Sequence, residues 1–222
     1  WWWLYVCSGC GGGWCCGALR RLWLHAGYSR GGDAAGPSRE WSTHLDEAGP
    51  DVRVTHGHRM EGRGSARSAA EVVQHRAYWE VRVCARGGPG ASVRCGVATS
   101  RHDLATPLSL PETERKAAAT SWAVDMGIAG VPEGAVVGCA LDQTYMPVTL
   151  ALVHESKQVA SVSMRTGGHV YPALSISGAG AAGAALEINL GDEPFCCPVP
   201  PGYAPAASAA VPAAVVRGGG VT

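Results

Sequence analysis

Glycine and proline interrupt the apolar pattern of this chain too often for long helices to form. The chain contains 31 glycines and 14 prolines in 222 residues. Between Trp41 and Tyr203, helical apolar spacing survives only in 65–74 and 111–119. Elsewhere apolar and polar residues alternate over short stretches separated by turn residues, the pattern of half-buried β-strands. We therefore predict strands at 51–55, 78–85, 92–98, 121–125, 135–141, 148–153, 158–164, 170–177 and 184–190.

The segment 78–85 shows the alternation most clearly. Trp79 and Val81 fall on one face, and the charged residues of the segment fall on the other, as in a strand of an antiparallel sheet with one face exposed. The turn-forming sequence 86–90 ends the segment, and 92–98 resumes it, so we expect these two strands to pair as a hairpin. The whole pattern predicts an all-β fold: an antiparallel β-sandwich of two packed sheets.

Composition divides the chain into three parts. Residues 1–40 are a Trp/Cys/Gly-rich low-complexity head and linker, 41–203 have the strand pattern of one domain, and 204–222 form an Ala/Pro/Gly-rich tail. We expect both termini to be disordered. Residues 1–19 have the length and the flanking arginines of a marginal membrane span, so membrane contact by the head stays open as the less favoured alternative.

Charge and cysteine usage narrow the function. The formal net charge is zero and 16% of residues are charged, so no basic surface is available to attract nucleic acid. The cysteines of the predicted domain, Cys84, Cys95 and Cys139, each stand alone in an apolar strand segment. This placement indicates reduced, buried thiols and a cytoplasmic or nuclear protein, with membrane association by the head as the alternative.

No catalytic motif emerges from the sequence. The glycines at 178–183 match the spacing of a dinucleotide-binding loop, but the segment that follows alternates as a strand, so we interpret them as a hairpin turn. The head cysteines lack zinc-site spacing, and His56-Gly57-His58 lacks a third ligand at a suitable distance in sequence. We expect no catalytic residue, no metal, no cofactor and no enzymatic activity.

The order of several strand sequences resembles the SPRY domain, a concanavalin-like jelly-roll β-sandwich. The resemblance spans about 41–203 and rests on Tyr-Trp-Glu-Val at 78–81, the run 134–142, Val-Tyr-Pro-Ala-Leu-Ser at 170–175 and the Asn-Leu-Gly ending at 189–191. The chain departs from the family pattern where His75-Arg76 replace a glycine before the Tyr-Trp strand and where Leu190 replaces a phenylalanine.

The resemblance implies a non-catalytic module that binds an unidentified protein or a short peptide motif through loops at one end of the sandwich, as a monomeric domain. The alternative is a membrane-tethered or architectural domain of a larger protein. Carried over from the family, the binding loops are 56–60, 99–107 and 177–180. Arg101 is the preferred anchor for a carboxylate or peptide carbonyl, and a solvated surface arginine is the competing interpretation. The candidate partner-binding residues are His56, His58, Thr99, Ser100, Arg101, Ser177 and Gly178.

Overall fold

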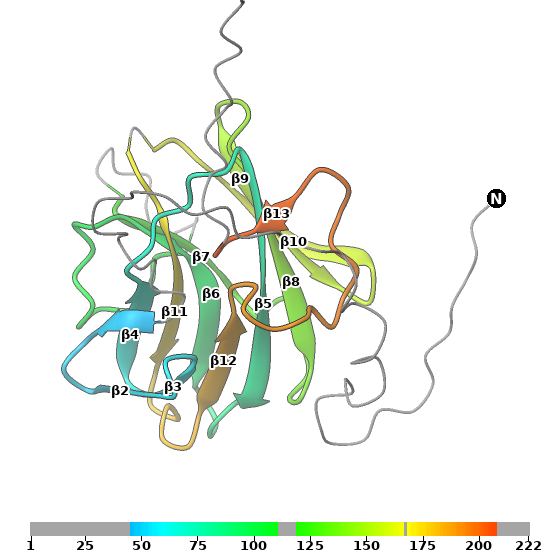
Figure 1. Cartoon of the computed structure of the whole chain (residues 1–222). Helices are drawn as coiled ribbons and strands as arrows, with labels where there is room; N and C mark the ends of the chain where they lie inside the picture. The colour runs from blue at the N-terminus through cyan, green and yellow to red at the C-terminus, as the bar shows by residue number, and fades with distance from the viewer. Residues whose placement is uncertain (1–44, 111–118, 167, 208–222) are drawn as a thin grey trace, which may run out of the picture.

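A computed structural model describes residues 45–110, 119–166 and 168–207. All elements in these ranges are strands, and they form two antiparallel sheets that face each other across an apolar core (Figure 1), which confirms the predicted β-sandwich. One sheet has five strands in the order β1–β4–β11–β6–β7. They are β1 (Leu45–Ala48), β4 (Gly64–Ser68), β6 (Ser92–Ala98), β7 (Ser121–Asp125) and β11 (Tyr171–Ser177).

The second sheet has eight strands, seven of them in the order β10–β9–β8–β5–β12–β3–β2. Its eighth strand, β13, pairs in parallel with β5 outside this order. The strands are β2 (Val52–Thr55), β3 (Arg59–Gly62), β5 (Arg76–Ala85), β8 (Val136–Asp142), β9 (Val148–His154), β10 (Lys157–Met164), β12 (Ala185–Asn189) and β13 (Ala204–Pro205).

The predicted strands are all present, and those at 92–98 and 121–125 have the expected bounds. Four strands were not predicted: β1, β3, β4 and β13. The segment 65–74, which kept helical apolar spacing, begins as strand β4 because it pairs with β1 on one side and β11 on the other. Tertiary pairing therefore overrides its local pattern. In the described ranges, no helix has the length and apolar character that a membrane span needs.

The predicted hairpin between 78–85 and 92–98 is wrong. Strand β5 pairs with β8 and β12 in the eight-stranded sheet, whereas β6 pairs with β7 and β11 in the five-stranded sheet. The residues 86–91 thus carry the chain from one sheet to the other. Turn-forming residues show where a chain reverses, but they do not show which strand it will pair with next.

The core lies between the sheets and has Trp79 at its centre, with no exposed surface. Cys95 of β6 and Cys139 of β8 face each other across the two sheets, also fully buried, with their Sγ atoms 3.9 Å apart. Burial raises the pKa of the Cys139 thiol, so this thiol is neutral at physiological pH. The expectation of buried thiols is confirmed for these two cysteines, while Cys84 is half-buried.

The outer face of β5 is also buried, contrary to the expectation of one exposed face. The segment that follows β12, drawn in orange in Figure 1, covers it. Phe195 packs edge-on against the ring of Tyr78, with centroids 4.9 Å apart. The carboxylate of Glu80, 2% exposed, accepts hydrogen bonds from the backbone amides of Cys196 (2.9 Å) and Cys197 (2.6 Å). The sequence pattern placed Glu80 on an exposed face of the strand. In the structure its carboxylate is buried and holds the C-terminal segment of the domain in place.

The domain continues past the predicted boundary at Tyr203. Strand β13 pairs with β5, and the amide of Ala206 donates to the Tyr78 carbonyl at 2.9 Å. The amide of Ala207 donates to Leu190 at 2.8 Å. Residues 204–207 thus belong to the sandwich rather than to a disordered tail. The predicted head, its cysteines and the rest of the tail lie outside the described residues.

Replacing Trp79 by Ala should lower the free energy of unfolding by about 3–5 kcal/mol, because it removes the largest buried side chain of the core. Urea unfolding of the full chain measures the change. Ile128→Ala is the control, since Ile128 is 82% exposed and its truncation should change stability by less than about 0.5 kcal/mol. Equal unfolding midpoints for the two variants would contradict this description of the core.

Replacing Glu80 by Ala should lower the free energy of unfolding by about 2–4 kcal/mol, because two backbone amides lose their acceptor and the space of a buried side chain is left empty. Glu80→Gln keeps one carbonyl oxygen as an acceptor and should cost less. Hydrogen exchange should localise the loss, with faster exchange at the amides of Cys196 and Cys197 in Glu80→Ala than in Glu80→Gln. Unchanged exchange at both amides would show that Glu80 does not hold this segment.

Candidate functional site

Strands β6 and β11 define the two ends of the sandwich. They run antiparallel, with Ala98 opposite Tyr171 at one end and Ser92 opposite Ser177 at the other. We call these the Thr99 end and the Gly178 end, after the residue that follows each strand. Because each strand residue advances the chain by about 3.3 Å, the two ends lie roughly 20 Å apart.

The predicted binding residues divide between these ends. Thr99, Ser100 and Arg101 lie at the Thr99 end, whereas Ser177 and Gly178 lie at the other. A single loop surface cannot contain both groups.

His56 and His58 precede strand β3, and the amide of Ile188 in β12 donates to the carbonyl of His58 at 2.9 Å. The carbonyl of Gly57, between them, accepts from the amide of Leu45, which pairs with Ser68 at the end of β4. The neighbouring residue Arg67 donates to the Thr99 carbonyl. The imidazole rings of the two histidines are 6.1 Å apart, and Nδ1 of His58 lies 2.8 Å from the His56 carbonyl oxygen.

At the Thr99 end, Arg101 is exposed, as a binding anchor and a solvated arginine would both require. At the other end, the side chain of Ser177 is buried (8% exposed), so Gly178 rather than Ser177 reaches the surface. Partner binding by any of these residues stays a prediction.

A cavity of about 540 Å³ opens at the Gly178 end. One wall is strand β3 with the residues that follow it, and the other is the glycine- and alanine-rich loop between β11 and β12. Its floor and rim are mostly backbone and methyl groups. The lining residues are Arg59, Glu61, Gly62, Arg63, Gly178, Ala179 and Ala181–Ala185.

The charges of the cavity are arranged by ion pairing on the β3 wall. Arg59 donates through Nε to Glu61 at 2.8 Å and through Nη1 to Glu187 at 3.0 Å. These two hydrogen bonds raise the pKa of Arg59. Burial raises the pKa of the adjacent Cys84 thiol to about 11, so it is protonated at physiological pH. The exposed Arg63 guanidinium stands at the rim.

Two glycine-rich loops pack backbone against backbone beside the cavity. The amide of Gly88 donates to the carbonyl of Gly180 at 2.8 Å. A Cβ on Gly180 would lie 2.3 Å from the Gly88 carbonyl oxygen, and a Cβ on Gly178 (φ +93°) would lie 2.0 Å from that of Gly90. Glycine is therefore required for close packing here.

This loop is not the hairpin turn that the sequence predicted. Strand β11 belongs to the five-stranded sheet and β12 to the eight-stranded sheet. The segment 178–184 thus crosses between sheets, as 86–91 does. The two crossovers close the sandwich at the same end, which brings the glycine motif to the edge of the cavity.

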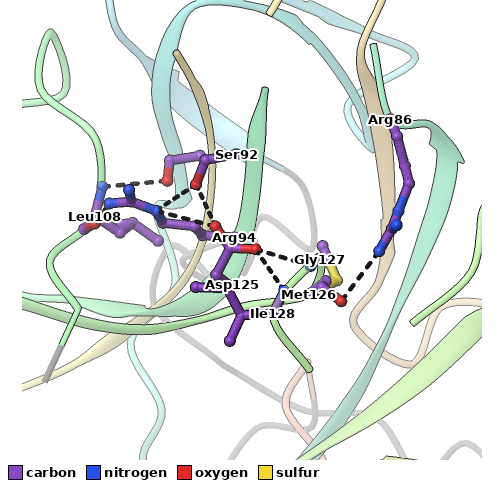
Figure 2. A network of polar contacts seen from close by, with 9 residues as sticks. Arg86, Ser92, Arg94, Leu108, Asp125, Met126, Gly127 and Ile128 are labelled. Carbon is purple, nitrogen blue, oxygen red and sulfur yellow. Dashed lines mark hydrogen bonds and ion pairs between the residues drawn. The ribbon is translucent and has the colours of Figure 1, made fainter. Parts of the chain in front are cut away.

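A third loop at this end is fixed by Asp125, at the end of β7. Its Oδ1 accepts from the amides of Gly127 (2.8 Å) and Ile128 (3.1 Å), and its Oδ2 accepts from the Ser92 hydroxyl, as Figure 2 shows. Arg94 donates to Ser92 at 2.8 Å and lies 3.9 Å from Asp125 Oδ2. The carboxylate thus holds the turn that displays Ile128.

Arg86 ties this turn to the first crossover. Its Nη2 donates to the carbonyl of Met126 at 3.3 Å, as Figure 2 shows. It also donates to the carbonyl of Val131, so it holds both ends of the turn. Ile128, at the tip, is 82% exposed. Sequence reasoning missed this loop, although an aspartate at the end of a strand followed by glycine is a local signal for a side-chain-capped turn.

The acidic side chains around the cavity and the third loop take part in structural contacts. Asp125 is used as a turn cap, and Glu61 and Glu187 are paired with Arg59. Among the residues that the structure describes, no group of three or more His, Cys, Asp or Glu side chains is placed to hold a metal ion.

Comparison with known proteins finds likeness to solved structures. No model of a known protein family matches the chain, and no curated protein matches it. A solved structure described as a human SPRY domain is similar, with a TM-score of 0.47 and 14% identity over 64% of this chain and 97% of that one. The two-sheet sandwich is established by the strand pairing itself.

Replacing Gly180 by Ala should destabilise the domain by about 1–3 kcal/mol, because the added methyl group meets the backbone of Gly88. Gly168→Ala is the matched control, since a Cβ there has no atom within 4 Å. Thermal unfolding of both variants measures the difference. Equal melting temperatures would contradict the close packing of the two crossovers.

Proposed function

We propose that this chain is a non-catalytic protein-interaction module that binds a short peptide or a partner domain at the Gly178 end. The observation that carries the proposal is the cavity of about 540 Å³ between β3 and the 178–184 crossover. Loops on a rigid sandwich are the usual position of recognition surfaces. The sequence resemblance to SPRY domains points to the same class of function.

The rigidity of the cavity wall supports peptide recognition. The crossover is held by its backbone contact with Gly88, and the neighbouring turn is held by Asp125 and Arg86. A surface ordered before binding loses little conformational entropy when a partner docks, so more of the contact energy appears as affinity. The wall therefore needs no refolding to receive a peptide.

Two side chains define the chemistry of the partner. Ile128 offers an exposed apolar contact at the Gly178 end, and Arg63 offers a guanidinium at the cavity rim that can make forked hydrogen bonds to a carboxylate. The methyl- and backbone-lined floor accommodates a small side chain. We infer a peptide with an acidic residue next to a small apolar one.

The prediction that Arg101 anchors a partner concerns the other end of the sandwich. The two ends form separate surfaces, because they lie roughly 20 Å apart along the strands. The Gly178 end is favoured here because it has the cavity. Arg101 serves as the discriminating control.

Peptides selected from a random display library on the full chain provide the test. Ala182→Trp should weaken binding at least about tenfold, because Ala182 is an exposed lining residue and an indole there occupies the cavity. Arg63→Ala should lower the affinity for peptides that carry an acidic residue. It should leave the affinity for peptides with the corresponding amide residue unchanged. Arg101→Ala should leave affinity unchanged.

Calorimetric titration measures these affinities, and the melting temperature of each variant checks that it is folded. If Arg101→Ala abolishes binding while Ala182→Trp retains it, the interface lies at the Thr99 end and the proposal fails. A library that yields no specific peptide also counts against it.

A further inference from the structure

A second hollow lies on the outer face of the eight-stranded sheet, beside the loop between β8 and β9. Its volume is about 320 Å³. It extends over β8, β9 and β10 and is bounded by the loop before β9 and by Tyr203. Its lining residues are Ala140, Asp142, Tyr145, Pro147, Thr149, Ala151, Gln158 and Tyr203. We call it the tyrosine groove.

The floor of the tyrosine groove is built from small side chains. Ala140 of β8 stands directly opposite Ala151 of β9, and Asp142 stands opposite Thr149 in the next pair but one. These residues share one face because strand side chains alternate. Tyr145 and Tyr203 also line the groove, and their side chains are much larger than those of the floor. Tyr145 is 79% exposed.

The charge of the groove is neutralised within the domain. Asp142 is the charged residue of the lining, and Arg76 donates to it through Nε at 2.9 Å. The same guanidinium lies over the ring of Tyr203, 5.9 Å from its centroid. Arg76 thus holds one wall in place and leaves the groove without an unpaired charge to select a charged ligand.

The neighbouring surface of the same sheet already holds a proline-rich segment of this chain. Residues 194–205 contain five prolines and connect Phe195, packed on Tyr78, to strand β13 beside β5. Tyr203 belongs to this segment and closes a turn through its amide, which donates to Pro200 at 3.2 Å. It also lines the tyrosine groove, so the groove continues the surface that the segment occupies.

From this geometry we propose that the tyrosine groove binds a proline-rich, extended segment of a partner protein. Aromatic side chains beside a floor of small residues, whose one carboxylate is paired with Arg76, resemble the aromatic-lined grooves by which proteins recognise the polyproline II conformation. Proline rings pack against the tyrosine faces, and the peptide carbonyls, which have no competing amides of their own, accept from Thr149, Gln158 and the tyrosine hydroxyls. This site is separate from the cavity at the Gly178 end and does not depend on it.

A fluorescein-labelled decaproline peptide tests the proposal by fluorescence anisotropy with the full chain. Saturable binding is expected, and Tyr145→Ala should weaken it about tenfold, equivalent to ~1.4 kcal/mol. Ala151→Arg, which fills the floor, should weaken it at least as much. Ala182→Trp is the matched control and should bind decaproline as the unmodified chain does, which distinguishes failure at this groove from failure at the cavity.

A labelled Gly-Ser decapeptide controls for binding to any flexible chain. Because Tyr145 is largely exposed, Tyr145→Ala should have the same melting temperature as the unmodified chain. This variant therefore tests the proposal even if Ala151→Arg fails to fold. No saturable decaproline binding, equal affinity for the Gly-Ser peptide, or equal affinity in Tyr145→Ala would overturn the proposal. A dimer that Tyr145→Ala dissociates would assign the groove to a second copy of the chain and overturn it as well.

Discussion

The burial of strand β5 on both faces is the constraint on which the rest of the domain depends. On its inner face Trp79 is fully buried in the core, and on its outer face the carboxylate of Glu80 is almost completely shielded from water. A buried charge is costly unless hydrogen bonds replace the lost water. Two backbone amides from 196–197 provide those bonds, so the chain after β12 must return across the sheet. That return places Phe195, strand β13 and Tyr203.

The second constraint is the close approach of two crossovers at the Gly178 end. Both leave one sheet and enter the other, and they touch through glycine backbone where side chains do not fit. A glycine pattern with the spacing of a dinucleotide-binding loop is thus explained by packing. Its consequence for function is indirect: it forms a rigid wall beside β3, and the cavity lies against that wall.

The two proposed binding surfaces follow from these two constraints. The crossovers shape the cavity at the end of the sandwich, and the returning segment brings Tyr203 to the edge of the tyrosine groove on its side. The surfaces differ in chemistry as well as in place. An exposed guanidinium, Arg63, marks the first, whereas the charge of the second is compensated by Arg76. We therefore expect different partners, or different segments of one partner, at the two sites.

Strand positions could be predicted because alternation is local. Strand β6 has the expected bounds, and Trp79 lies in the core as its alternating segment indicates. Strand β3 was missed because Met60 is its one buried apolar residue, so no alternation is visible. Thr99 and Gly178 lie at opposite ends of the sandwich. The sequence indicates that a loop follows each strand, but it does not indicate at which end of the sandwich that loop lies. The antiparallel pairing of β6 with β11 decides this.

By itself the sequence determined that the chain folds into strands, where most of them lie and which side chains face inward, since these follow from a period of two residues. The tertiary structure decided which sheet each strand joins, that Glu80 is buried, and where the cavity and the tyrosine groove form. Those outcomes depend on contacts between distant residues: Glu80 meets Cys197, and Gly88 meets Gly180. No local pattern encodes such pairs, because they form only when both sheets and their crossovers are in place.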